Sequence, residues 1–361
     1  MRYFKRLVLF LSLLLPLAVS GQYLLSDNGK ILTSGSGIAD ESGWVRPYEW
    51  LPISHLVTDG EEKTVALYAV WNAAGIAKGY NNYCAIYATG AYTVDWGDGT
   101  VDNVASGVQA EHEYVYDNLP ASSYCSRGYR QAVITITPQM GQHITNLDFS
   151  RKHASNNIRY ATNGFLDIRV SGTDIVRILL YNSTYSNCKM LEAFYGYQAT
   201  NKCTSMLNMF IGCTSLQQLD LSSFNTAAVT TMEYMFASCY SLQQLDLRSF
   251  NTAAVTSMAY MFAYCYSLQG INLAHTSLLN VTDNTQITNN IKSLLVCRLP
   301  LIAKTFTVAN NLLTATELNA LFGDLKDLTG LTAQTITITG NPGAATCNQA
   351  IATAKNWIVV N

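Results

Sequence analysis

The residue types that could catalyse a reaction or bind a metal are present in this chain, but they do not have the spacing that catalysis or metal binding requires. None of the five histidines belongs to a Cys-His or His-Glu-x-x-His pattern, which a zinc site would use. The glycines form no phosphate-binding loop, and no Gly-x-Ser-x-Gly turn presents a serine nucleophile. We therefore predict a protein that is not an enzyme and needs no metal and no cofactor, with His112 in a structural role.

Acidic residues leave two other chemistries to weigh. Asp95, Asp98 and Asp102 carry the oxygen atoms that calcium prefers, but their spacing is not that of an EF-hand loop. The glycines on both sides of Asp98 indicate a tight turn in which this carboxylate bonds its own backbone. Because the fold sets the distance between the paired acids of a glycosidase, a carbohydrate-active or other hydrolytic enzyme with acids in the irregular segment 140–200 stays open as the alternative.

The nine cysteines raise the question of disulfides. Cys213, Cys239 and Cys265 are 26 residues apart, so they occupy one register and form a ladder. Ladder neighbours on strands ~4.8 Å apart could be bridged, although a row of small buried thiols is the simpler prediction. The same buried role is predicted for Cys188, Cys203, Cys297 and Cys347. Cys84 and Cys125 are the pair that we would test for a disulfide.

The cysteine ladder belongs to a repeat. Residues 213–238 and 239–264 are nearly the same sequence, and a third copy begins at Cys265, which gives a constant period of 26 residues. A fixed period of this length is typical of a solenoid, in which each unit buries its apolar face against its neighbours. Leu216, Leu242, Leu268 and Leu294 keep the same step. The sequence therefore predicts a short array of stacked units with irregular caps at both ends.

Each unit combines two periodicities. Leu216, Leu219 and Leu221 form the L-x-x-L-x-L pattern of a leucine-rich repeat, and alternation with polar residues predicts a short strand. In the second half, Met232, Met235, Phe236 and Cys239 fall at i, i+3, i+4 and i+7, which predicts about two turns of helix. We therefore expect an α+β repeat. Strands are expected near residues 147–149, 168–170, 178–180 and 335–339, and helices near 318–322 and 347–354.

A second motif precedes the repeats. Trp96-Gly97-Asp98-Gly99-Thr100 ends an alternating segment, and further alternation occurs at 65–71 and 132–136. These segments predict a small all-β, immunoglobulin-like sandwich over residues 62–139, followed by the solenoid over residues 140–361.

Both regions resemble known families. The phrase Met-Phe-x-x-Cys-x-Ser-Leu-x-x-Leu-Asp-Leu-x-x-Phe-Asn-Thr, closely repeated over residues 206–273, is similar to the repeat of the BspA-like leucine-rich surface proteins of bacteria. That resemblance implies extracellular adhesion or partner binding. The Trp-Gly-Asp-Gly-Thr run, with His112, Tyr114 and Tyr129 after it, resembles a PKD-type immunoglobulin-like domain, which implies a spacer or binding module.

The first residues predict the compartment. Arg2, Lys5 and Arg6 precede an apolar run at 7–15 and small residues at 18–20, so residues 1–20 are predicted to be a signal peptide and 21–61 a lead segment. The apolar run is too short to span a bilayer ~30 Å thick, and no lipoprotein cysteine follows it. We expect a secreted or cell-surface protein with no membrane span after cleavage. Because the net charge is −2 and only 13% of residues are charged, nucleic acid is not an expected partner.

Two surfaces could hold an extracellular protein or glycan. The first is the outward, concave face of the repeat strands, and its predicted ligand-binding residues are Gln218, Asp220, Ser222, Gln244, Asp246, Arg248, Asn272 and Arg298. The second consists of Tyr240, Tyr264 and Tyr266, which replace smaller residues of the preceding copies. Tyrosine is common in binding surfaces because it offers a large contact area at low entropy cost. We predict a binding or adhesion protein.

Overall fold

The computed structural model describes residues 45–58, 60–78, 80–155, 164–181, 188–197 and 202–361, together with the backbone of strands β1 (Tyr23–Leu25) and β2 (Ile31–Thr33). The predicted signal peptide and most of the lead segment lie outside the described residues. The chain forms two compact units, Met1–Trp50 and Leu51–Asn361. In the first unit β1 and β2 pair antiparallel. All that follows concerns the second unit.

The second unit is mostly β, so the predicted α+β class is wrong. Its α-helices are short: α2 (Ala73–Ile76), α3 (Ala315–Asp324) and α4 (Ala350–Thr353). Its first strands are β3 (Lys63–Trp71), β4 (Tyr83–Thr89), β5 (Tyr92–Asp95), β6 (Val101–Val104), β7 (Gln109–Glu113), β8 (Tyr124–Cys125) and β9 (Tyr129–Pro138). The strands predicted at 65–71 and 132–136 are present in β3 and β9.

These first strands form two facing sheets. One contains β3, β9, β5 and β6, and the other contains β4 and β7. The Tyr92 hydroxyl on β5 crosses between them and donates to the carbonyl oxygen of Ile86 on β4 at 3.1 Å. Stacked rings of Tyr68 and Tyr114 fill the space between the sheets. A mixed aromatic and aliphatic core therefore holds the two layers together.

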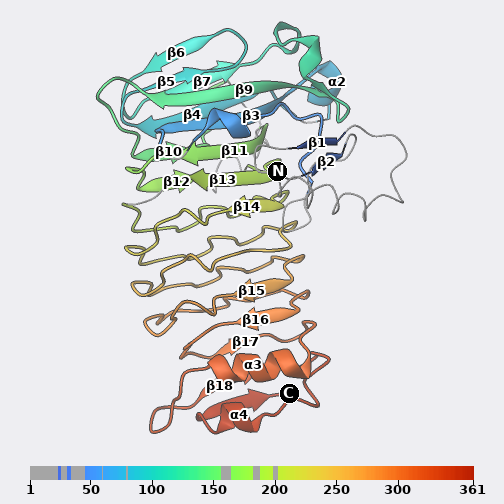
Figure 1. Cartoon of the computed structure of the whole chain (residues 1–361), viewed down its shortest axis with the longest axis vertical. Helices are drawn as coiled ribbons and strands as arrows, with labels where there is room; N and C mark the ends of the chain where they lie inside the picture. Colours follow the sequence, from blue (N-terminus) through green and yellow to red (C-terminus); the bar gives the residue numbers. More distant parts are fainter. Residues whose placement is uncertain are drawn as a thin grey trace, which may run out of the picture. The chain divides into compact units, whose positions relative to one another are not determined.

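Both sheets continue without a break into the repeats (Figure 1). The continuing strands are β10 (Asn146–Asp148), β11 (Phe165–Ser171), β12 (Arg177–Leu179), β13 (Ala193–Tyr197) and β14 (Gln218–Asp220). β3 pairs antiparallel with β11, which begins the parallel ladder β11, β13, β14, while β4 pairs antiparallel with β10. The first sheets thus cover the N-terminal edge of the solenoid, an edge that would otherwise be open to another strand.

The solenoid has about seven turns. Its later strands are β15 (Gly270–Asn272), β16 (Val296–Arg298), β17 (Phe306–Thr307), β18 (Gln334–Thr337) and β19 (Trp357–Val360). The unit between β14 and β15 has no full strand. Its Asp246 forms an isolated parallel β-bridge with Asn272, so the 26-residue register continues there. Leu216, Leu242, Leu268 and Leu294 are fully buried, as the constant spacing predicts. The N-terminal cap strands are confirmed in β10, β11 and β12, and the C-terminal elements in α3, β18 and α4.

The predicted helix at residues 232–239 is wrong, because the segment is a series of turns. Tyr234 and Ser238 have φ angles of 52° and 62°, which a right-handed helix does not allow. The N–H groups of Met232, Tyr234, Phe236 and Ser238 donate instead to carbonyls of the next turn, at 2.8 to 3.0 Å. Those of Met235, Ala237 and Cys239 close i to i−3 turns. The same residues are buried in either conformation, so the apolar spacing could not distinguish them.

Candidate binding surfaces

The acids of the strand face bind their own backbone. Asp220 accepts from the N–H of Ser222 at 2.9 Å, and Asp246 accepts from the N–H of Arg248 at 2.9 Å. Asn272 accepts from Ala274 N–H at 3.0 Å in the same place of its unit. Each side chain therefore stabilises the turn that follows its strand, in the manner of an Asx-turn. This role explains why three successive units have a short acid or amide at that position.

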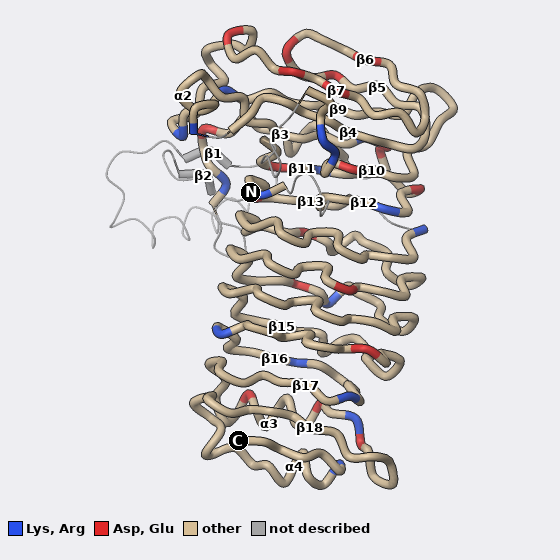
Figure 2. The backbone as a smooth tube through the Cα atoms, turned by 180° about the vertical axis from the view of Figure 1, so that it is seen from behind, with Lys and Arg blue, Asp and Glu red and all other residues tan. Residues whose placement is uncertain are grey.

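Three of the four charged residues predicted on this face are in ion pairs within the chain. Asp246 receives Arg248 Nε at 3.0 Å and Nη2 at 2.6 Å, and the hydrogen bonds from Arg248 lower the pKa of Asp246. Arg298 is held by Asp324 of α3. Most residues from β13 to β16 are uncharged (Figure 2). Gln218, Gln244 and Ser222 complete the predicted set on or beside these strands. The strand face thus offers a partner mainly neutral polar groups.

Tyrosines form a more distinctive surface. Tyr240, Tyr264 and Tyr266 are 42%, 37% and 48% exposed, so the predicted residues do lie at the surface. The rings of Tyr240 and Tyr266 stack at 5.1 Å, and Tyr264 meets Tyr266 edge to face at 6.3 Å. Two half-buried residues that the sequence analysis missed, Tyr234 and Tyr260, stack at 4.7 Å with an interplanar angle of 4°. We call these five residues the tyrosine surface.

The tyrosine surface draws on three consecutive copies of the repeat, and none of its positions has tyrosine in more than two copies. At the position of Tyr234 and Tyr260, the flanking copies have Asn208 and Gln286. At the position of Tyr264 the other copies have Gly212, Ser238 and Asn290, and at that of Tyr240 and Tyr266 they have Thr214 and Lys292. The 26-residue register, read one copy further in each direction, was the signal that could have identified Tyr234 and Tyr260.

Three of these tyrosines occupy a conformation that usually belongs to other residues. Tyr234, Tyr260 and Tyr264 have φ angles of 52°, 56° and 63°, in the left-handed region. That region costs an ordinary L-residue ~1–2 kcal/mol and favours glycine and asparagine, which other copies have at Asn208, Gly212 and Asn290. Aromatic stacking returns ~0.5–1.5 kcal/mol per pair. Fold stability alone therefore gives no clear reason for tyrosine at these positions.

The Trp96 to Thr100 turn is structural. Asp98 accepts from the N–H of Thr100 at 3.1 Å and lies 2.8 Å from Nε2 of His112, whose ring stacks on Trp96 at 4.9 Å. Partial burial raises the pKa of Asp98, but the hydrogen bonds from Thr100 and His112 outweigh it and the pKa is lowered. Asp95 accepts from Gly97 N–H, and Asp102 accepts from the Trp96 indole. The three carboxylates thus hold a turn together, and within the described residues they form no metal-binding group.

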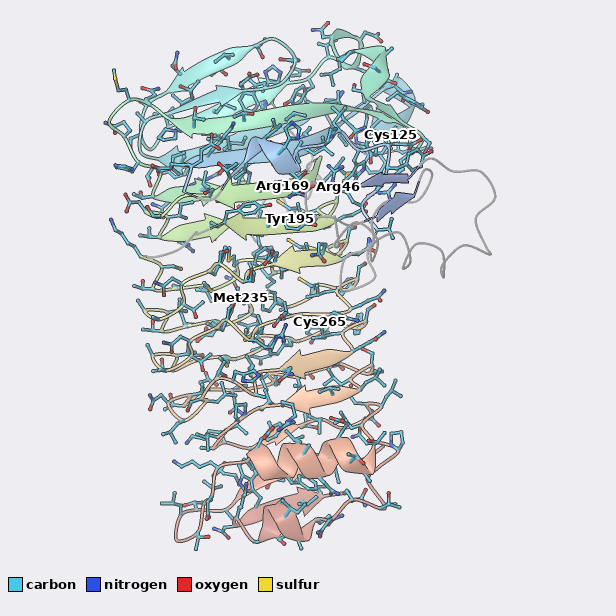
Figure 3. The ribbon with its side chains drawn as sticks, in the orientation of Figure 1. Arg46, Cys125, Arg169, Tyr195, Met235 and Cys265 are labelled. Carbon is cyan, nitrogen blue, oxygen red and sulfur yellow. The ribbon has the colours of Figure 1, made fainter. Side chains whose placement is uncertain are left out.

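The structure has no disulfide between Cys84 and Cys125, the pair that the sequence analysis selected for a test. The reason is position: Cys84 faces the core between the sheets near Cys188, whereas Cys125 lies on β8 beside β9. The ladder thiols are hydrogen-bonded, since Cys239 and Cys265 each donate to the carbonyl oxygen of a phenylalanine one unit earlier, at 3.1 Å. Met235 and Cys265 lie in the interior of the stacked turns (Figure 3).

Every acid in the segment 140–200 forms an ion pair. The pairs are Asp148 with Arg151 at 2.7 Å, Asp167 with Arg169 at 3.4 Å, Asp174 with Lys202 at 2.6 Å, and Glu192 with Arg127. Arg169 on β11 also stacks on Tyr195 of the neighbouring strand β13, 4.0 Å from the ring centroid (Figure 3). Each acid of this segment is therefore partnered by a cation of the same chain.

Residues 181–295 match the family model described as "Mycoplasma protein of unknown function, DUF285". This segment contains β13 to β15 and the whole tyrosine surface. No curated protein and no solved structure matches the chain. Among the residues with a described structure, no helix is long and apolar enough to cross a bilayer.

Proposed function

We propose that this chain is an extracellular binding or adhesion protein whose partner contacts the tyrosine surface. The observation that supports this most is that each of these positions has tyrosine in only one or two copies, whereas other copies have residues such as Asn, Gly, Thr and Gln there. A structural requirement of the repeat would act on every copy. A requirement set by a partner acts only where the partner binds.

The chemistry of tyrosine fits this role. Its ring gives a large contact area with few rotatable bonds, and its hydroxyl can both donate and accept. Tyrosine is also enriched among residues that dominate binding energy. Mutual stacking holds the rings in place before a partner arrives, which lowers the entropy cost of binding. A protein surface or a neutral glycan chain would meet these rings without needing charge complementarity.

The finer identity of the two regions belongs to the same proposal. We propose that the repeats are those of a BspA-like leucine-rich surface protein, and that residues 62–139 act as a PKD-type spacer. The repeat phrase and the Trp96 to Thr100 turn support these assignments. Residues 1–20 would direct secretion, which gives a mature chain that begins at residue 21 or 22. Amino-terminal sequencing of the secreted protein tests that start.

A variant with residues from the other copies tests the binding site. In this flank-matched variant, Tyr234→Asn, Tyr240→Thr, Tyr260→Asn, Tyr264→Asn and Tyr266→Thr are combined, so that each position takes a residue that another copy has there. We expect the mature chain to bind members of a glycan and extracellular-protein array, and the flank-matched variant to bind them at least about tenfold more weakly. Asp246→Ala with Arg248→Ala is the matched control on the strand face and should keep its affinity. The opposite result, loss with the control and none with the tyrosine variant, would move the site to the strand face.

A further inference from the structure

A shallow depression of about 260 Å³ lies on the outer face of the sheet β12, β10, β4, β7, apart from the tyrosine surface. Strand pairing builds it. β10 and β12 are parallel and place Asn146 beside Arg177, while the antiparallel pair β10 and β4 places Asn146 opposite Thr89 and Asp148 opposite Tyr87. Residues that are partners on neighbouring strands project to the same side of a sheet. Side chains from three strands therefore converge on one spot.

One of the basic groups in the depression is fixed in advance. Arg151 lies over the ring of Tyr87, with its Cζ 4.4 Å from the ring centroid. Its Nε forms an ion pair with Oδ2 of Asp148 at 2.7 Å. Asp148 is only 4% exposed, and its other oxygen accepts from the N–H of Ser150 at 2.9 Å. A buried carboxylate and an aromatic ring thus hold the guanidinium, whose side chain stays 39% exposed.

The second basic group is Arg177, which is exposed and forms no ion pair with any described residue. The depression therefore contains two guanidinium groups and one carboxylate, an excess of one positive charge. Neutral hydrogen-bonding groups adjoin it: Asn146 Nδ2 donates to the Thr89 hydroxyl at 2.6 Å, and that hydroxyl also lies 2.6 Å from the hydroxyl of Thr145. Such a set matches a small ligand with one negative charge and several hydroxyl groups.

We propose that this depression binds an acidic monosaccharide unit, a sugar residue that carries a carboxylate. The planar fork of Arg177 can pair with a carboxylate through two parallel hydrogen bonds, a geometry that lysine does not offer. Arg151, Asn146 and Thr89 supply donors and acceptors for ring hydroxyls. The volume suits a single sugar rather than a larger ligand, since pockets for drug-sized molecules occupy roughly 300–1,000 Å³.

Titration of the full chain with D-glucuronate and D-galacturonate, against D-glucose and D-galactose as uncharged counterparts, tests the proposal. We expect both uronates to bind, each at least about tenfold more tightly than its neutral sugar, since hydrogen bonds to charged groups are the stronger ones. Arg177→Gln removes the charge from an exposed side chain and should weaken uronate binding about tenfold, whereas Arg248→Gln on the solenoid should leave it unchanged.

Three results would overturn the proposal: no uronate binding at millimolar concentration, equal binding of neutral and acidic sugars, or uronate binding that Arg177→Gln leaves intact. Inorganic phosphate is the comparison anion. If phosphate binds more tightly than either uronate and displaces it, the site is a general oxyanion site and the sugar assignment is wrong. Because the depression and the tyrosine surface share no residue, the flank-matched variant should bind uronates as the wild type does.

Discussion

Cys265 shows how position governs the reactivity of a residue in this solenoid. Its thiol is fully buried and donates to the carbonyl oxygen of Phe236, and burial raises its pKa to about 12. Burial likewise raises the pKa of Cys239 and Cys213 well above the usual value. The thiolate is the reactive form of cysteine, so these residues should be inert in the folded protein although they lie in one register.

Thiol labelling of the native protein tests this description. We expect a thiol reagent to leave the ladder cysteines unmodified at both pH 7 and pH 9, because a thiol with a pKa of about 12 stays protonated throughout this range. Cys347, which is only half-buried, should react first. After unfolding in denaturant all nine cysteines should be labelled. Rapid labelling of Cys239 or Cys265 in the native protein would contradict the buried thiol ladder. So would an intact mass lowered by the two hydrogens that a disulfide loses.

At the scale of elements, each unit depends on hydrogen bonds to the next one. Tyr234 N–H donates to Ala259, and Tyr260 N–H donates to Thr285 one unit later. Removing residues 239–264 would therefore let Tyr234 reach Thr285 in an unchanged register. Nearest-neighbour contacts dominate the stability of such arrays.

A pair of deletions tests the register. The chain without residues 239–264 should fold with a lower melting temperature, because one whole unit is lost and the interfaces on both sides re-form. The chain without residues 239–258 loses 20 residues and shifts the buried leucines out of line, so it should not fold. Circular dichroism with thermal melts would distinguish the two, and equal melting curves would mean that the register is not what holds the turns together.

The sequence predicted the repeat but not the conformation of its second half. Leu216 and its equivalents were assigned to the core correctly, because the constant step of 26 residues leaves one interpretation. Met232, Met235 and Phe236 were assigned to a helix, because turns and helix bury the same three side chains. Arg177 and Tyr87 could not be connected from sequence, since their proximity depends on β10 pairing with both β4 and β12. Long-range strand pairing of that kind leaves no local pattern.

At the scale of the whole second unit, the sheets pass from antiparallel to parallel at two places, β3 with β11 and β4 with β10. The strands before and after residue 139 therefore belong to the same two sheets. Removing the first strands would expose the edges of β10 and β11, which are otherwise paired. Open strand edges promote association with other chains.

Two truncations test this continuity. A chain that begins at Leu51 keeps the complete second unit and should stay monomeric with one cooperative melt. A chain that begins at Gly141 lacks β3 and β4, and should aggregate or melt at a much lower temperature. Analytical ultracentrifugation and calorimetry would measure both properties. If the shorter chain folds as a stable monomer, the solenoid does not need the first sheets as its cap.

The central claim is that the tyrosine surface serves a partner and not the fold, and the free energy of unfolding of the flank-matched variant tests it without any knowledge of that partner. Relief of left-handed strain at three tyrosines should offset the lost stacking, so we predict a change within about 1 kcal/mol of wild type. Leu247→Ala, which truncates a buried core residue, is the positive control and should cost ~2–5 kcal/mol. A comparable loss in the flank-matched variant would show that the tyrosines hold the solenoid together, and would contradict the claim.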